Sequence, residues 1–99
     1  MSVPPSTMTS TQAVQTRVAS PLRSYTEGRA VVEAHGATVR ELLTDLDRRY
    51  PGIRFRMIDE QDRVRTHIRL YVDTTPVSAL DQAVERGQTL HLICALSGG

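Results

Sequence analysis

The segment ATVRELLTDLDRRYPG, residues 37–52, predicts one strongly amphipathic helix. Thr38 is a good N-cap, and Glu41 follows three residues later, which is the capping-box spacing. Pro51-Gly52 predicts the end of the helix. The apolar residues fall at helical spacing and form one stripe: Val39, Leu42, Leu43, Leu46 and Tyr50. The charged residues lie off that stripe: Arg40, Asp45, Arg48 and Arg49.

On both sides of this helix the chain alternates between apolar and polar residues, which predicts β-strands. The expected strands are 14–18, 29–34, 66–72 and 90–95. The first two should pair as an antiparallel hairpin. The sides expected to face inward are formed by Val14 and Val18, by Ile68, Leu70 and Val72, and by Leu90, Leu92 and Cys94. Asp73 to Pro76 is expected to break the third strand, and Leu80 and Val84 to pack a short turn or edge segment.

The expected order is therefore strand, strand, helix, strand, short segment, strand. One helix can cover one face of a mixed sheet of four or five strands. Because strands follow the helix, we expect an α+β protein of the β-grasp type, with the first and last strands parallel at the sheet centre. The β-grasp domain should span residues 12–95. Residues 1–11 are rich in Ser, Thr and Pro and predict a flexible leader, and residues 96–99 form a flexible C-terminal tail.

Composition excludes several classes of function. The net charge of +1, with arginines scattered among the acids, argues against a nucleic-acid interface. No apolar run approaches the roughly 18–20 residues of a membrane span, and there is no secretory signal. The single cysteine fits a cytoplasmic location. All 12 basic residues are arginine, so the chain offers no lysine that could accept an isopeptide bond.

Other candidate chemistry is weak. Cys94 lies in an apolar run, so we expect a buried and inert thiol rather than a nucleophile or persulfide relay. The three histidines are far apart in sequence and lack the spacing of metal ligands: His35, His67 and His91. Asp59, Glu60 and Asp62 lack the rest of a calcium-loop pattern, so a solvated turn is expected. We also find no phosphate loop and no nucleophile elbow.

The sequence ends in Gly98-Gly99. Glycine has no Cβ, so such a tail is thin and can enter a narrow active-site channel with its carboxylate leading. Frayed small residues at the end of a domain are the competing interpretation. Gly98-Gly99 alone favours the frayed end, and the segments that precede the tail decide between the two interpretations.

Taken in order, these segments resemble the ubiquitin-like sulfur carriers of the MoaD/ThiS type, from about Val14 to Gly99. The resemblance rests on residues 37–43 and 46–52, Asp59-Glu60, residues 68–73, Arg86-Gly87 and Gly98-Gly99. Residues 65–68, Arg-Thr-His-Ile, are most similar to the carriers that serve cysteine biosynthesis. The chain departs from the family at Asp73, where Asn is usual, at Cys94, where many members have Pro, and in its longer leader.

The resemblance implies a protein co-substrate rather than an enzyme. A ubiquitin-activating-type enzyme would use ATP to adenylate the Gly99 carboxylate. A persulfide or sulfide donor would then convert it to a thiocarboxylate, and an acceptor synthase would take the sulfur. Gly98 would give the tail access, and the docking surface would include Ile93, Ala95 and Leu96. The carrier itself would bind no cofactor or metal.

Three other functions stay open at this stage. The chain could be a protein modifier joined through Gly99 to lysines of other proteins. It could be the small subunit of a heteromer resembling molybdopterin synthase, or a plain β-grasp interaction domain. The sequence does not name the acceptor, since cysteine, thiamine, molybdopterin, thiolated tRNA and secondary metabolites all draw on carriers of this type.

Overall fold

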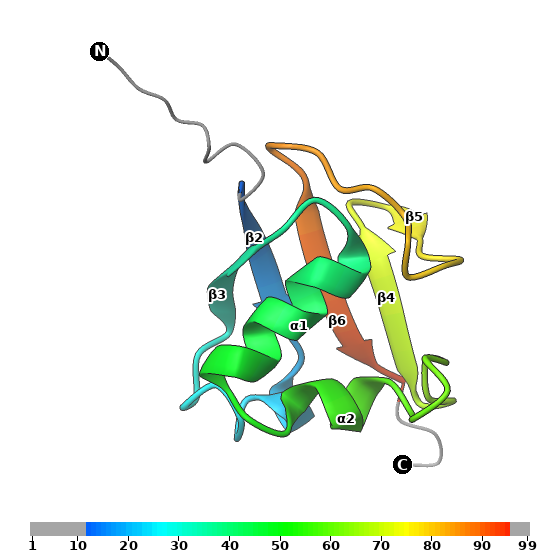
Figure 1. Cartoon of the computed structure of the whole chain (residues 1–99). Coiled ribbons are helices and arrows are strands. Elements are labelled where there is room, and N and C mark those ends of the chain that lie inside the picture. The colour runs from blue at the N-terminus through cyan, green and yellow to red at the C-terminus, as the bar shows by residue number, and fades with distance from the viewer. Residues whose placement is uncertain (1–11, 96–99) are drawn as a thin grey trace.

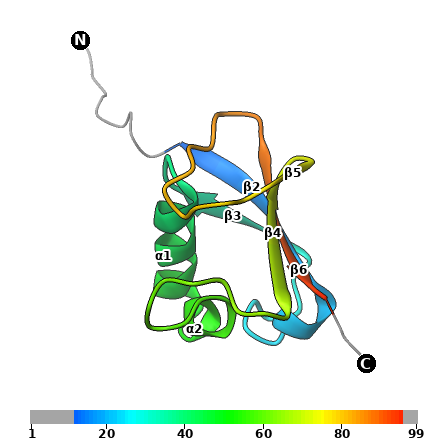
Figure 2. The ribbon, with the colours of Figure 1, turned by 90° about the vertical axis from the view of Figure 1, so that its right-hand side faces the viewer.

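The computed structural model describes residues 12–95, and they form one mixed five-stranded sheet with helices on one face (Figures 1 and 2). The strand order is β3-β2-β6-β4-β5. The strands are β2 (Ala13–Val18), β3 (Val31–His35), β4 (Ile68–Val72), β5 (Thr75–Pro76) and β6 (Thr89–Cys94). The helices are α1 (Val39–Arg49), α2 (Ile53–Met57) and a short 3-10 turn, η1 (Ser20–Leu22). The predicted β-grasp architecture is confirmed.

The central pairing is the one expected. Strand β2 pairs antiparallel with β3 and parallel with β6, and β6 pairs antiparallel with β4. The last strand therefore lies in the middle of the sheet, between the first strand and β4. The second strand begins two residues later than predicted, at Val31, and ends at His35.

The core lies between the sheet and α1. Inward residues of β2, β4 and β6 alternate with exposed ones, as the sequence pattern predicts. Every apolar residue of the α1 stripe up to Leu46 is fully buried. Asp45, expected off that stripe, is also buried, because its carboxylate accepts from His35 N at 2.9 Å and lies 3.3 Å from the Arg49 guanidinium.

The start of α1 has the predicted cap with one change. Thr38 Oγ1 accepts a hydrogen bond from Glu41 N at 3.2 Å. The Glu41 carboxylate bonds Ala37 N at 2.7 Å, one residue before the expected partner. This compact turn leaves no room at Gly36, where a Cβ would lie 2.7 Å from Glu41 Cβ.

Helix α2 was not predicted. The chain does stop α1 before Pro51-Gly52, but it then begins a second helix at Ile53. The Asp47 side chain enables this restart, since its Oδ1 accepts from Gly52 N and Arg54 N, each at 3.1 Å. A carboxylate in that place satisfies amide groups that otherwise lack partners at a helix start.

The fifth strand, β5, lies in a segment that the sequence pattern did not predict as a strand. The Asp73-to-Pro76 segment, expected only as a break, turns tightly so that Thr75 and Pro76 pair with β4. Asp73 makes the turn with a left-handed φ of 55°, and its carboxylate accepts from Thr89 N at 3.0 Å. Left-handed backbone favours Asn and Asp among residues with side chains. Leu80 and Val84 are buried as expected, and they lie in the loop between β5 and β6, which agrees with the short turn that was one of the two expectations.

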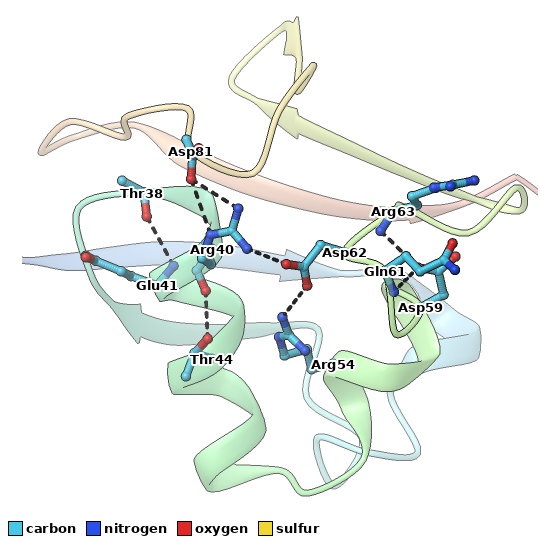
Figure 3. Close-up of polar contacts among 10 residues, drawn as sticks. All are labelled: Thr38, Arg40, Glu41, Thr44, Arg54, Asp59, Gln61, Asp62, Arg63 and Asp81. Atoms are coloured by element: carbon cyan, nitrogen blue, oxygen red, sulfur yellow. Dashed lines mark hydrogen bonds and ion pairs between the residues drawn. The ribbon is translucent and has the colours of Figure 1, made fainter.

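An arginine network joins the helices to the loops (Figure 3). The Arg40 guanidinium bonds Asp62 at 2.8 Å and Asp81 at 3.1 Å, and Arg54 bonds the other Asp62 oxygen at 3.0 Å. These contacts connect α1, α2 and the loops before β4 and after β5. The bonds from Arg40, followed by those from Arg54, lower the pKa of the Asp62 carboxyl.

Replacing Gly36 tests the close approach at the α1 cap. Gly36→Ala should lower the free energy of unfolding by about 2–3 kcal/mol, because the new methyl group overpacks against Glu41. Gly87→Ala is the control, since its Cβ would meet nothing within 4 Å and only the left-handed backbone costs about 1 kcal/mol. Urea denaturation measures both variants, and equal losses would contradict the steric account.

Replacing Asp62 tests the arginine network. Asp62→Asn keeps the left-handed backbone, φ 63°, but removes the charge, so the variant should be less stable than the wild type near neutral pH. A lowered pKa stabilises the fold above the ordinary aspartate value of about 3.9, and this contribution disappears as the pH falls through the lower folded value. The two proteins should therefore converge in acid. Glu60→Gln is the control, because it removes a charge from the same turn without removing an ion pair of the network. A constant gap for Asp62→Asn would contradict the charge argument.

Candidate functional site

The predicted reactive tail lies outside the described residues. Leu96, Gly98 and Gly99 belong to residues 96–99, and the predicted leader belongs to residues 1–11. The structure does describe the strand that leads to the tail. Strand β6 ends at Cys94, and Ala95 N then donates to His67 O at 2.8 Å. The last described residue is thus hydrogen-bonded to the chain that enters β4.

Two of the three predicted docking residues fall within the described chain. Ile93 points to the outer face of the sheet, opposite Arg69 of β4, and is 39% exposed. Ala95 is half-buried beside it. Large exposed apolar side chains are few in the described chain: Val31, Phe55 and Ile93. Ile93 therefore offers apolar surface two residues before the end of the described chain, which suits the predicted role.

The outer face around Ile93 carries polar and aromatic side chains. His91 lies between Arg17 of β2 and Tyr71 of β4 in the sheet register. One step along, Ile93 lies against Arg69, whose guanidinium bonds Thr66 O at 2.8 Å. An apolar side chain flanked by a fixed arginine is a composition common at protein interfaces.

Cys94 faces the helices, on the same side as Leu90 and Leu92, as predicted. It is half-buried and packs against the core. Burial raises the pKa of its thiol, and the nearby positive charge of Arg56 only partly opposes this effect. The thiol is therefore protonated near neutral pH, which favours a structural role, because the thiolate is the reactive form.

The three histidines lie at separate places. His35 Nδ1 lies 3.4 Å from Asp45 Oδ2 at the edge of the sheet, His67 is exposed before β4, and His91 is half-buried on the outer face. Within residues 12–95, no group of three His, Cys, Asp or Glu side chains is placed to hold a metal ion.

The acidic residues of the turn before β4 make hydrogen bonds that stabilise the fold. Asp59 Oδ1 accepts from Gln61 N at 2.8 Å and Arg63 N at 3.0 Å, while Asp62 bonds two arginines (Figure 3). The bonds from Arg63 and then Gln61 lower the pKa of Asp59. Next to this turn, a hollow of about 330 Å³ is lined by Asp62, Val64, Val77 and Leu80. Its one carboxylate is already paired, so it offers no acid–base pair.

The exposed ring of Phe55 is a surface feature that the sequence did not predict. Phe55 of α2 is 57% exposed, and the Arg65 guanidinium lies 4.4 Å from the centre of its ring. Arg65 Nε also donates to Phe55 O at 2.6 Å. The exposed Phe55 was not predicted because helix α2 was not predicted. The spacing of Ile53 and Met57, both buried, was the available signal for that helix.

In the described part, no helix is long and apolar enough to cross a membrane.

Comparison with known proteins adds independent evidence. Over 83 residues the chain is 30% identical to the sulfur carrier protein CysO of Mycobacterium tuberculosis, covering 79% of this chain and 89% of CysO. The crystal structure of that CysO superposes with a TM-score of 0.79 at 26% identity and covers 84% of this chain and 99% of that one.

Two further structures have the same fold. A chain of the crystal structure of the Amycolatopsis orientalis BexX/CysO complex superposes with a TM-score of 0.80 at 35% identity, covering 87% of this chain and 99% of that one. Small archaeal modifier protein 1 from Methanosarcina acetivorans gives a TM-score of 0.74 at 16% identity, covering 90% and 98%, which shows the fold alone. The model of the ThiS family matches residues 17–99, and this chain belongs to that family.

Proposed function

We propose that the chain is a sulfur carrier of the ThiS/CysO type and that its Gly99 carboxylate is the group that becomes a thiocarboxylate. The observation that carries the proposal is the family match over residues 17–99, which runs through the Gly98-Gly99 end. The 30% identity to a protein named as a sulfur carrier supports the same activity.

The chemistry requires activation, because a carboxylate is a poor electrophile. A ubiquitin-activating-type enzyme would transfer AMP from ATP to Gly99 and release pyrophosphate. Hydrosulfide would then displace AMP and leave the thiocarboxylate. A persulfide donor would instead form an acyl disulfide, from which a thiol releases the thiocarboxylate. In this scheme ATP is consumed by the partner, and the carrier acts as a co-substrate without a bound cofactor.

The head of the carrier would position the tail. Strand β6, which leads to the tail, is hydrogen-bonded on both sides and is therefore held in place up to Cys94. Ile93, Ala95 and Leu96 would contact the enzyme that draws in Gly98 and Gly99. The crystallised BexX/CysO complex supports an interaction of this kind, because it joins a similar chain to a second protein. We place the reaction in the cytoplasm and propose a sulfur-acceptor synthase as the second partner.

The terminal group is the decisive test. Intact-mass analysis of the protein from its native host should find a fraction in which sulfur replaces a terminal oxygen. Deleting Gly98-Gly99 should abolish this fraction, whereas Gly28→Ala, in an open turn far from the tail in sequence, should retain it. Unchanged sulfur transfer by the protein that lacks Gly98-Gly99 would contradict the proposal. Adducts with lysines of other proteins, without thiocarboxylate, would instead identify a protein modifier.

The outer-face contact has its own test. Ile93→Asp should lower the thiocarboxylated fraction about tenfold, since a charge at the centre of an interface is poorly tolerated. Val31→Asp is the matched control, because Val31 is also 39% exposed but lies on the edge strand β3. Equal effects of the two substitutions would contradict docking through Ile93.

Cys94 provides a test of where the sulfur resides. Because its thiol is half-buried and its pKa is raised, Cys94→Ala should leave the thiocarboxylated fraction unchanged. The measurement is the same mass analysis, with a thermal melt to confirm folding. Loss of the thiocarboxylate from a folded Cys94→Ala protein would show that the thiol relays sulfur.

A further inference from the structure

We infer that a second docking element lies near the end of β6, on the helix side of the sheet. It consists of Phe55, Arg56 and Arg65, called here the Phe55 patch. We propose that it binds an acidic surface on the enzyme that receives the tail, which places carboxylates against the arginines and an apolar side chain against the Phe55 ring. This inference rests on the proposed function, since it requires an enzyme that takes up the tail.

The patch is exposed and at the same time held in place. Phe55 leaves 57% of its surface in solvent, although large apolar side chains are usually buried. The Arg65 guanidinium stacks 4.4 Å from the ring centre, and its Nε bonds Phe55 O at 2.6 Å. Arg65 N also donates to Met57 O at 2.9 Å. A partner would therefore find these groups already ordered, which lowers the entropy cost of binding.

The patch lies at the end of the domain where β6 ends. Figures 1 and 2 both show α2 and the end of β6 at the same end of the molecule. Arg65 O accepts from Ile68 N at 2.9 Å, and two residues further along Ala95 N bonds His67 O at 2.8 Å. Arg56 is close enough to Cys94 for its charge to act on that thiol. A protein that holds the tail is thus brought next to the patch.

The positive charges of Arg56 and Arg65 favour an acidic partner. Among residues 12–95, the arginines in ion pairs are Arg40, Arg48, Arg49 and Arg54. Arg56 and Arg65 belong to none of these pairs, although the charge of Arg65 acts on the Asp59 carboxyl. Among the described residues, the Arg65 side chain uses only its Nε in a hydrogen bond, so its terminal nitrogens can still donate to a carboxylate. Arginine and aromatic residues are enriched where binding energy concentrates in protein interfaces. Single-stranded RNA also stacks on such groups, but it needs a basic groove that follows several phosphates. Asp59 and Glu60 interrupt the positive charge next to α2, which leaves room for a small carboxylate contact rather than for such a groove.

Site-specific photo-crosslinking in the native host tests the inference with the full chain. The carrier would contain Phe55→p-benzoylphenylalanine in one strain and Leu96→p-benzoylphenylalanine in another. Both positions should yield an adduct with the same protein, and the peptide joined to position 55 should be rich in Asp and Glu. Val31→p-benzoylphenylalanine is the exposed control and should not yield this adduct.

Charge removal supplies the second measurement. Arg56→Ala and Arg65→Ala should each lower the yield of the Leu96 adduct about fivefold or more. Arg86→Ala removes the same charge from the loop before β6, at the opposite end of that strand, and should leave the yield unchanged. Arg56 is exposed, and among residues 12–95 its side chain makes no hydrogen bond or ion pair, so its variant should fold, and a thermal melt checks this.

The outcomes are distinct for the two proposals. No adduct at position 55, a different protein from that at position 96, or an adduct removed by ribonuclease would overturn the acidic docking surface. If the thiocarboxylate is still found in that case, the sulfur carrier function stands without the patch. If the thiocarboxylate is absent and position 96 captures nothing, both proposals fail.

Discussion

The fold depends on the parallel pairing of the last strand with the first. Strand β6 pairs with β2 on one side and β4 on the other, and it buries Leu90 and Leu92 completely against the helices. A strand bonded on both sides opens only when much of the sheet opens. Strand β6, which leads to residues 96–99, is therefore one of the most firmly held segments of the described domain. In the proposed function, a partner that binds the tail would not unfold the domain.

The local sequence pattern predicted the long amphipathic helix and the strands in which apolar and polar residues alternate. The α1 stripe, the alternation of β4 and the central position of β6 all follow from periodicity and from element order. The fifth strand and α2 do not follow from periodicity, because each depends on an aspartate side chain that bonds a backbone amide elsewhere in the sequence. Asp73 adopts a left-handed turn and bonds Thr89 N, 16 residues away, while Asp47 caps the next helix.

In the candidate site, too, some features follow from local sequence pattern and others depend on tertiary contacts. Alternation along β6 placed Ile93 on the outer face and Cys94 on the inner one. The contacts of Arg40 with Asp62 and Asp81 join residues 22 and 41 positions apart, so no local pattern reveals them. The stacking of Arg65 on Phe55 required the helix that sequence reasoning missed. A composition without lysine was visible at once, yet which arginines are paired depends on tertiary structure.

The two proposed contacts lie on opposite sides of the sheet near the end of β6. Ile93 lies on the outer face of the sheet, whereas the Phe55 patch lies on the helix side. One contact would leave the carrier free to rotate about the tail, but two contacts on opposite sides fix its orientation. If Gly99 is the reacting group, as proposed, a fixed orientation would present it to the partner's active site at high effective concentration. The domain would then contribute to the reaction by orientation.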